Sequence, residues 1–171
     1  EVALHRGRDE LIEMSNGCIC CTLRADLLEQ ISALAREQRF DYLLIESTGI
    51  SEPMPVAETF AFLNAEGFSL SELARLDTLV TVVDGSRFQG LLESPETVAR
   101  DDTPANTSTR PLADLLIEQV EYANVILVNK LDLLDEHGYQ AVHAILAGLN
   151  PTARIVPMVQ GSVALSSILG T

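Results

Sequence analysis

Three cysteines fall within four positions of the chain, in the stretch NGCICCTLR, and the 171 residues contain no other cysteine. Cys18 and Cys21 have the C-x-x-C spacing that often supplies two zinc ligands, and in an extended segment Cys18 and Cys20 point the same way. A helix is expected to begin near Thr22, so its positive end and Arg24 favour the thiolate form that binds zinc or cobalt. We interpret the cluster as an open metal site that can release its ion.

Two other interpretations of the cysteines stay open. Buried structural cysteines are the commonest use of this residue, although three of them after Gly17 in one loop are unusual. A C-x-x-C redox couple is the second alternative, but that motif usually opens a helix after a strand in a thioredoxin-like unit.

The sequence NKLD at 129–132 directly follows an apolar run, and its residue types suit a guanine base. Asp132 can accept two parallel hydrogen bonds, from the ring N–H and the exocyclic amine of guanine, and adenine offers no such donor pair. Asn129 can bond the base and neighbouring loops, and the Lys130 stem can lie over the ring plane. A strand end with a solvated loop is the plain alternative, but the position after a predicted parallel strand favours guanine recognition.

A second polar group, ESTG at 46–49, also follows an apolar run. The Glu46 carboxylate could bind the water shell of magnesium or orient a water that attacks a phosphate. Gly49 would let the backbone approach a γ-phosphate closely. The alternative is a strand-ending glutamate followed by a turn. Asp84 of VVDG is assigned no role, because an aspartate before glycine is ordinary turn chemistry.

These groups need a sheet that brings several strand ends to one edge. Continuous apolar runs predict buried parallel strands at 41–47, 76–84 and 123–129, a weaker one at 154–158 and an edge strand at 10–14. Helical spacing predicts helices at 22–38, 53–63, 111–120, 136–149 and 162–169, with a proline in the first position of the third. The polar stretch 93–110 is predicted to be a mobile loop.

Alternating strands and helices predict an α/β fold with a mostly parallel sheet and flanking helices, in a single domain over residues 1–171. Ligands of such sheets gather beyond the carboxyl ends of the strands. We therefore expect the groups at 46–49, 82–85 and 129–132 to lie near one another.

Composition narrows the possible partners. The formal net charge of -14 argues against a nucleic-acid or anionic-membrane surface, and 47% hydrophobic residues predict a packed core. The sequence contains no apolar run of transmembrane length and no signal-peptide pattern, so a soluble, cytoplasmic protein is predicted.

Lys130 is the only lysine in the chain. A phosphate-binding P-loop, G-x-x-x-x-G-K-[ST], needs a lysine of its own, so these residues contain no such loop. Because the sequence starts at Glu1 without an initiator methionine, we expect a strand, the P-loop and a helix to precede it in the intact protein.

Five stretches together resemble one family: NGCICCTLRADL, LLIESTGISEPMPV, VTVVDGSRF, EQVEYANVILVNKLDLL and LNPTARI. They occur in the order seen in the CobW-like GTPases of the CobW/HypB/UreG superfamily, and the resemblance covers nearly the whole chain. GCICC and ESTG are specific to that group, whereas NKLD is shared with GTPases generally. The resemblance implies a P-loop NTPase-like fold and a GTP-hydrolysing metal chaperone.

The resemblance also implies roles for individual residues. It matches the metal-binding motif to Cys18, Cys20 and Cys21, the switch glutamate to Glu46, and the guanine reader to Asn129, Lys130 and Asp132. GTP and magnesium would organise the metal site, and hydrolysis would release zinc or cobalt to a client metalloprotein. The oligomeric state is not determined by the sequence, and a homodimer is compatible with it.

The chain departs from the family in two respects. Family members carry a P-loop before this region and often a smaller C-terminal domain after it, so the chain is interpreted as a truncated GTPase core with little hydrolysis of its own. Many also have a histidine-rich metal-loading stretch, whereas this chain has only His5, His137 and His143.

Overall fold

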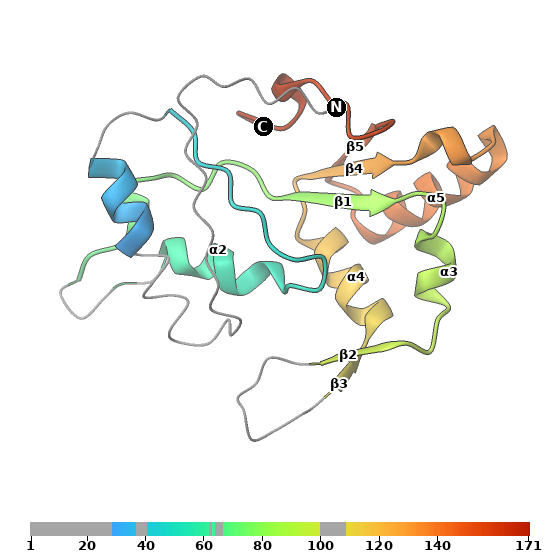
Figure 1. Ribbon diagram of the computed structural model, residues 1–171, viewed down its shortest axis with the longest axis horizontal. Helices are drawn as coiled ribbons and strands as arrows, with labels where there is room; N and C mark the ends of the chain where they lie inside the picture. The colour runs from blue at the N-terminus through green and yellow to red at the C-terminus, as the bar shows by residue number, and fades with distance from the viewer. Residues whose placement is uncertain (1–28, 37–40, 62, 64–66, 100–108) are drawn as a thin grey trace.

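The computed structural model describes residues 29–36, 41–61, 63, 67–99 and 109–171 (Figure 1). The predicted edge strand at 10–14 lies outside the described residues, and so do Cys18, Cys20 and Cys21. Of the helix predicted at 22–38, residues 29–36 are helical and the others are outside the described part.

A parallel sheet of three strands forms the centre of the described structure. It contains β1 (Val80–Asp84), β4 (Val125–Asn129) and β5 (Arg154–Pro157) in the order β1-β4-β5. In register, Asp84 lies opposite Asn129. Three predicted strands and the α/β class are therefore confirmed, although β1 begins later than expected.

The central strand β4 separates two apolar layers. Ile126 and Val128 are fully buried in the larger core cluster, whereas Val125 and Leu127 pack with Met158 in a second cluster. Successive side chains of a strand point to opposite faces, so each face of β4 receives alternate residues. Burial on both faces explains why this strand is a continuous apolar run.

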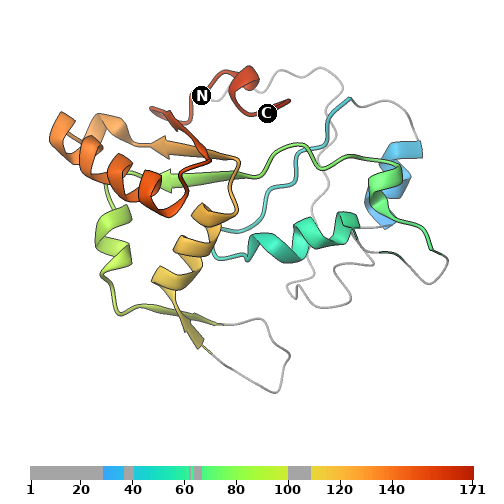
Figure 2. The ribbon, with the colours of Figure 1, turned by 180° about the vertical axis from the view of Figure 1, so that it is seen from behind.

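Helices cover one face of the sheet. They are α3 (Phe88–Leu92), α4 (Leu112–Glu121) and α5 (Glu136–Leu149), seen from behind in Figure 2. The helix predicted at 136–149 is confirmed residue for residue. The one predicted from 111 is also present, but Pro111 is its N-cap and the last residue of β3. None of the helices in the described part of the chain has the length and apolar character to cross a bilayer.

The predicted helix at 162–169 is wrong. Only a single 3-10 turn, η3 (Leu165–Ser167), forms there, and its N-cap residue makes no side-chain cap. Val163 and Ile168 instead pack against the second sheet face. A short helix is costly to nucleate, so packing on the sheet decided the local structure.

A smaller cluster lies beside the sheet. The helical residues 29–36, α2 (Pro53–Ala61) and η1 (Leu70–Glu72) contribute Ile31, Phe60 and Leu70 to it. The η1 turn has a capping box. The Ser69 side chain accepts a hydrogen bond from the backbone N–H of the turn, and the Glu72 side chain accepts one from the backbone N–H of Ser69. The helix predicted at 53–63 is confirmed through Ala61.

The strand predicted at 41–47 is wrong. Residues 41–47 belong to no strand, all of them are exposed, and Leu44 is 82% exposed. Strand β1 pairs only with β4 among the described residues, and its Val82 is 62% exposed. An apolar run becomes a buried strand only with a partner on its hydrogen-bonding edge, and no described segment pairs with this one.

The interpretation of 93–110 as a loop holds for residues 93–96 but is wrong at 97–99 and 109–110. β2 (Thr97–Ala99) and β3 (Thr109–Pro111) form an antiparallel pair in which Val98 lies opposite Arg110. Each strand is only three residues long, too short for an alternating polar and apolar pattern to be recognised in the sequence. Residues 100–108 between them are outside the described part.

Candidate functional site

The carboxyl ends of β1 and β4 are joined by an ion pair. Lys130 follows β4, and its Nζ donates to Asp84 Oδ2 at 2.8 Å. The other oxygen, Asp84 Oδ1, accepts from Ser86 N at 3.1 Å and from Ser86 Oγ at 2.7 Å. Both carboxylate oxygens of Asp84 are therefore occupied, so Asp84 does more than end a strand.

The protonation of Asp84 follows from these contacts. Partial burial raises the pKa of its carboxyl, but the hydrogen bonds and charge of Lys130 and the hydrogen bonds of Ser86 outweigh burial. The net pKa lies below its ordinary value, so the carboxylate is charged at neutral pH. Lys130 itself has left-handed backbone, with φ 63°. For a non-glycine residue this costs about 1–2 kcal/mol, which the surrounding contacts must offset.

Asn129 connects three segments at this edge. Its carbonyl accepts from Gly85 N at 3.0 Å, and its Oδ1 accepts from Gly161 N at 3.2 Å. Gly161 belongs to the turn after β5, where Gln160 and Gly161 both have positive φ. The loops after β1, β4 and β5 therefore meet at the last residue of β4.

Gly85 allows this close approach. A Cβ at Gly85 would lie 3.0 Å from Val128 Cγ1 and 3.2 Å from the Asn129 carbonyl oxygen. Any larger residue would push the ends of β1 and β4 apart.

Asp132 lies in η2 (Leu131–Leu133) and is exposed. Its side chain has no hydrogen bond to another described residue. In the predicted guanine-binding motif, the Asp132 carboxylate is therefore accessible to a ligand, three residues after Asn129 at the end of β4.

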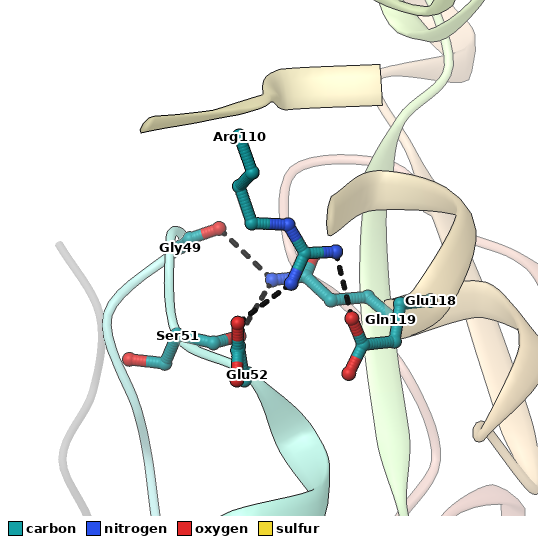
Figure 3. Close-up of polar contacts among 6 residues, drawn as sticks. All are labelled: Gly49, Ser51, Glu52, Arg110, Glu118 and Gln119. Atoms are coloured by element: carbon teal, nitrogen blue, oxygen red, sulfur yellow. Dashed lines mark hydrogen bonds and ion pairs between the residues drawn. The ribbon is translucent and has the colours of Figure 1, made fainter. Parts of the chain in front are cut away.

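Glu46 and Gly49 lie in a different setting from the one expected. Both are exposed, and Glu46 ends no strand. A turn follows, in which Ser51 N donates to the Thr48 carbonyl at 3.0 Å. The Gly49 carbonyl accepts from Gln119 Nε2 of α4 at 3.1 Å (Figure 3). The structure therefore joins this segment to α4, and no hydrogen bond between described residues links it to the β4 end.

Sequence reasoning missed several residues with defined polar contacts. Asp84 could have been found, because its strand was expected to end at the same edge as NKLD. Arg110 could not, because its partner Glu52 is 58 residues away and it lay in a supposed loop.

No metal-binding group of three or more His, Cys, Asp or Glu side chains occurs among the described residues. His137 is exposed on α5, and the His143 ring packs edge-on against Tyr139 with centroids 5.8 Å apart. The candidate metal ligands remain Cys18, Cys20 and Cys21, which the structure does not describe.

Solved structures define the class of fold. The Zn(II)-bound YjiA GTPase from E. coli has a TM-score of 0.62 and is 24% identical in sequence, over 84% of this chain and 38% of that one. The likeness shows that the parallel sheet and its flanking helices share the α/β fold of that protein.

Sequence comparison then identifies the family. The family model described as "CobW/HypB/UreG, nucleotide-binding domain" matches residues 2–157, so the chain belongs to this family. "Zinc-regulated GTPase metalloprotein activator 1" of Dictyostelium discoideum is 46% identical over 95% of this chain, and "Zinc chaperone CobW" of Sinorhizobium sp is 32% identical over 95%. The chain covers 35% and 46% of these two relatives, so it spans less than half of their length.

Proposed function

We propose that the full-length protein containing these residues is a GTP-dependent metal chaperone of the cytoplasm. It binds GTP at the carboxyl edge of the sheet and passes zinc or cobalt to a client metalloprotein. The names of the two relatives, a zinc-regulated GTPase and a zinc chaperone, support this class of activity.

The observation that carries the nucleotide proposal is the meeting of three loops at Asn129. At this edge Asn129 is hydrogen-bonded to Gly85 and Gly161, and Lys130 is ion-paired with Asp84. The Asp132 side chain is exposed to solvent. A carboxylate beside a rigid polar edge suits a base that presents two adjacent N–H donors. Guanine has that pattern and adenine lacks it.

In the hydrolytic step we assign Glu46 the role of orienting the attacking water. Water adds in line to the γ-phosphate as the bond to the β-phosphate oxygen breaks, which yields GDP and inorganic phosphate. Magnesium would neutralise charge on the phosphates. It needs only one or two protein carboxylates, and the exposed Glu46 has the hard oxygen donors it prefers. Gly49 would let the backbone come near the γ-phosphate.

The metal is the cargo in this proposal. We assign its binding to Cys18, Cys20 and Cys21, whose thiolates suit zinc and cobalt. A chaperone must couple the two sites, so GTP should change the affinity for zinc, and zinc should change the affinity for GTP by the same factor.

The test measures zinc affinity of the full-length protein with and without GTP. Asp132→Asn should weaken GTP binding by about 10-fold to 100-fold, the cost of a lost charged hydrogen bond, and remove the effect of GTP on zinc. The triple change of Cys18, Cys20 and Cys21 to Ser should abolish tight zinc binding and spare GTP binding.

Each alternative predicts a different result. A metal-binding module without hydrolysis would bind zinc equally with and without GTP. A thiol oxidoreductase would show a reversible Cys18–Cys21 couple and bind no metal under reducing conditions. Undiminished zinc affinity in the triple variant would refute the cysteine site.

A further inference from the structure

We propose that Gln119 and Arg110 are positioning residues for GTP hydrolysis, which hold the turn that follows Glu46. The inference rests on the proposed function, because it takes Glu46 as the water-orienting group. It assigns roles to two side chains that lie outside the NKLD edge and outside the cysteine cluster.

The turn at 48–51 lacks the support of a sheet. Among the described residues its one backbone hydrogen bond runs from Ser51 N to the Thr48 carbonyl at 3.0 Å, and the two hydroxyls of these residues hydrogen-bond at 2.9 Å. Residues 41–50 are exposed, and helix α2 begins only at Pro53. A segment of this kind has little local stability of its own, so its position depends on contacts from outside.

Gln119 supplies two of those contacts. Its Nε2 donates to the Gly49 carbonyl at 3.1 Å and to the Ser51 carbonyl at 3.0 Å (Figure 3). Both hydrogens of one amide group therefore hold the main chain of the turn. The Gln119 carbonyl in turn accepts from Thr81 Oγ1 of β1 at 2.6 Å. The turn is thus tied through one residue of α4 to the central sheet.

Arg110 holds the next residue of the same segment. Its Nη1 pairs with Glu52 Oε1 at 2.6 Å, and its Nη2 pairs with Glu118 Oε2 at 2.7 Å. The arginine side chain is only 13% exposed, so these pairs are less screened by solvent than surface pairs. Burial lowers the pKa of Arg110, but the hydrogen bonds and charges of Glu118 and Glu52 outweigh it and the net pKa is raised.

The two contacts act on one short stretch of main chain from two elements. Glu118 and Gln119 are neighbours on α4, and Arg110 lies on β3, so the helix and the strand hold Gly49, Ser51 and Glu52 together (Figure 3). Glu46 is three residues before Gly49. A shift of the turn would therefore move Glu46, and small misplacements of a reacting group can cost up to about 100-fold in rate.

The experiment measures kcat and KM for GTP in the full-length protein. Gln119→Ala, Gln119→Glu and Arg110→Gln should lower kcat by about 10-fold to 100-fold with KM changed less than about 2-fold, because geometry and not ground-state binding is lost. Arg110→Lys should recover only part of kcat, since an ammonium cannot bridge two carboxylates in the planar geometry of the guanidinium.

Two variants serve as matched controls. Gln140→Ala removes a glutamine amide on α5 that bonds only Glu136 Oε1 among the described residues, at 2.8 Å. Arg75→Ala removes an arginine paired with Asp77 at 3.2 Å, whose side chain is 84% exposed. Both should keep wild-type kcat. Hydrogen exchange of the Ser51 amide gives a direct readout of the turn and should accelerate in the Gln119 and Arg110 variants alone.

A kcat within about 3-fold of wild type in both Gln119→Glu and Arg110→Gln would overturn the proposal, as would a lowered Tm with unchanged kcat. If the wild-type protein does not hydrolyse GTP, the proposed function fails, but hydrogen exchange still tests whether Gln119 and Arg110 hold the turn. In that case unchanged exchange at Ser51 in the variants would refute the positioning contacts, and faster exchange would support them.

Discussion

The ion pair between Lys130 and Asp84 gives the only lysine of the chain a fixed direction. The lysine side chain is 50% exposed and the aspartate side chain 25%, so the pair contributes at most about 1 kcal/mol to stability. Its value lies in orientation, because it keeps the aliphatic stem of Lys130 at the edge where a base would lie.

The first prediction concerns the pH dependence of this pair. Because the folded-state pKa of Asp84 is lowered from its ordinary value of 3.8, its contribution to stability is complete above that pH. The contribution is lost as the pH falls further, through the folded pKa. The free energy of unfolding of wild type should exceed that of Asp84→Asn at neutral pH, and the difference should vanish in acid.

Urea titrations across this range measure the difference. Asp41→Asn, which removes an exposed carboxylate outside any helix or strand, controls for the change in net charge. A difference for Asp84→Asn that stays constant from neutral pH to acid would contradict the prediction.

Among the elements, the ends of α4 and α5 and the start of β5 are joined by one buried side chain. Asn150, which is 6% exposed, donates through Nδ2 to the carbonyls of Val120, Glu121 and Ala123 at 2.9, 3.0 and 2.9 Å. Its Oδ1 accepts from Thr152 N and Oγ1 and from Ala153 N. The residue thus supplies donors at the C-terminal end of α4, where the helix's own hydrogen-bond ladder stops.

The second prediction follows from this network. Asn150→Ala should lower the free energy of unfolding by about 2–3 kcal/mol, since buried carbonyls lose their donor. Asn150→Asp should be at least as damaging, because it puts a carboxylate against three carbonyl oxygens. Chemical denaturation measures both. Asn124→Ala is the control, because Asn124 is exposed and its side chain accepts one bond, from Leu79 N at 2.8 Å. If Asn150→Asp left the protein as stable as wild type, the account would be contradicted.

Element boundaries were predictable where local pattern and burial agree. Helix α5 has an apolar face and the N-cap Asp135, whose side chain accepts from Gly138 N at 2.7 Å, and its range was correct. The error at 162–169 arose because its apolar residues pack on the sheet without a helix. The strand predicted at 41–47 was wrong because an apolar run alone does not determine whether another strand is available to pair with it.

At the scale of the whole molecule, apolar side chains of β1 and of the segment 41–47 are exposed. Tyr42, Leu43 and Leu44 are 57%, 45% and 82% exposed, and Val82 of β1 is 62% exposed. The relatives are more than twice as long as the matched region, so their chains contain residues beyond it.

The third prediction concerns the 171-residue chain by itself. It should hydrolyse GTP no faster than a background without protein, because these residues contain no P-loop lysine. The single lysine, Lys130, is ion-paired with Asp84 at the edge proposed to bind the base. Phosphate release from the purified chain, compared with the full-length protein, measures this. Turnover by the 171 residues at the rate of the full-length protein would contradict the prediction and the need for a P-loop.

The sequence alone determined the parallel α/β class, the family and the position of NKLD directly after a buried strand. Short-range periodicity and residue chemistry suffice for these features. Only the tertiary structure decided that Asp84 holds Lys130, that Gly161 meets Asn129, and that Arg110 and Gln119 hold the turn after Glu46. These partners lie 32 to 70 residues apart, and a one-dimensional pattern carries no information about which distant groups become neighbours.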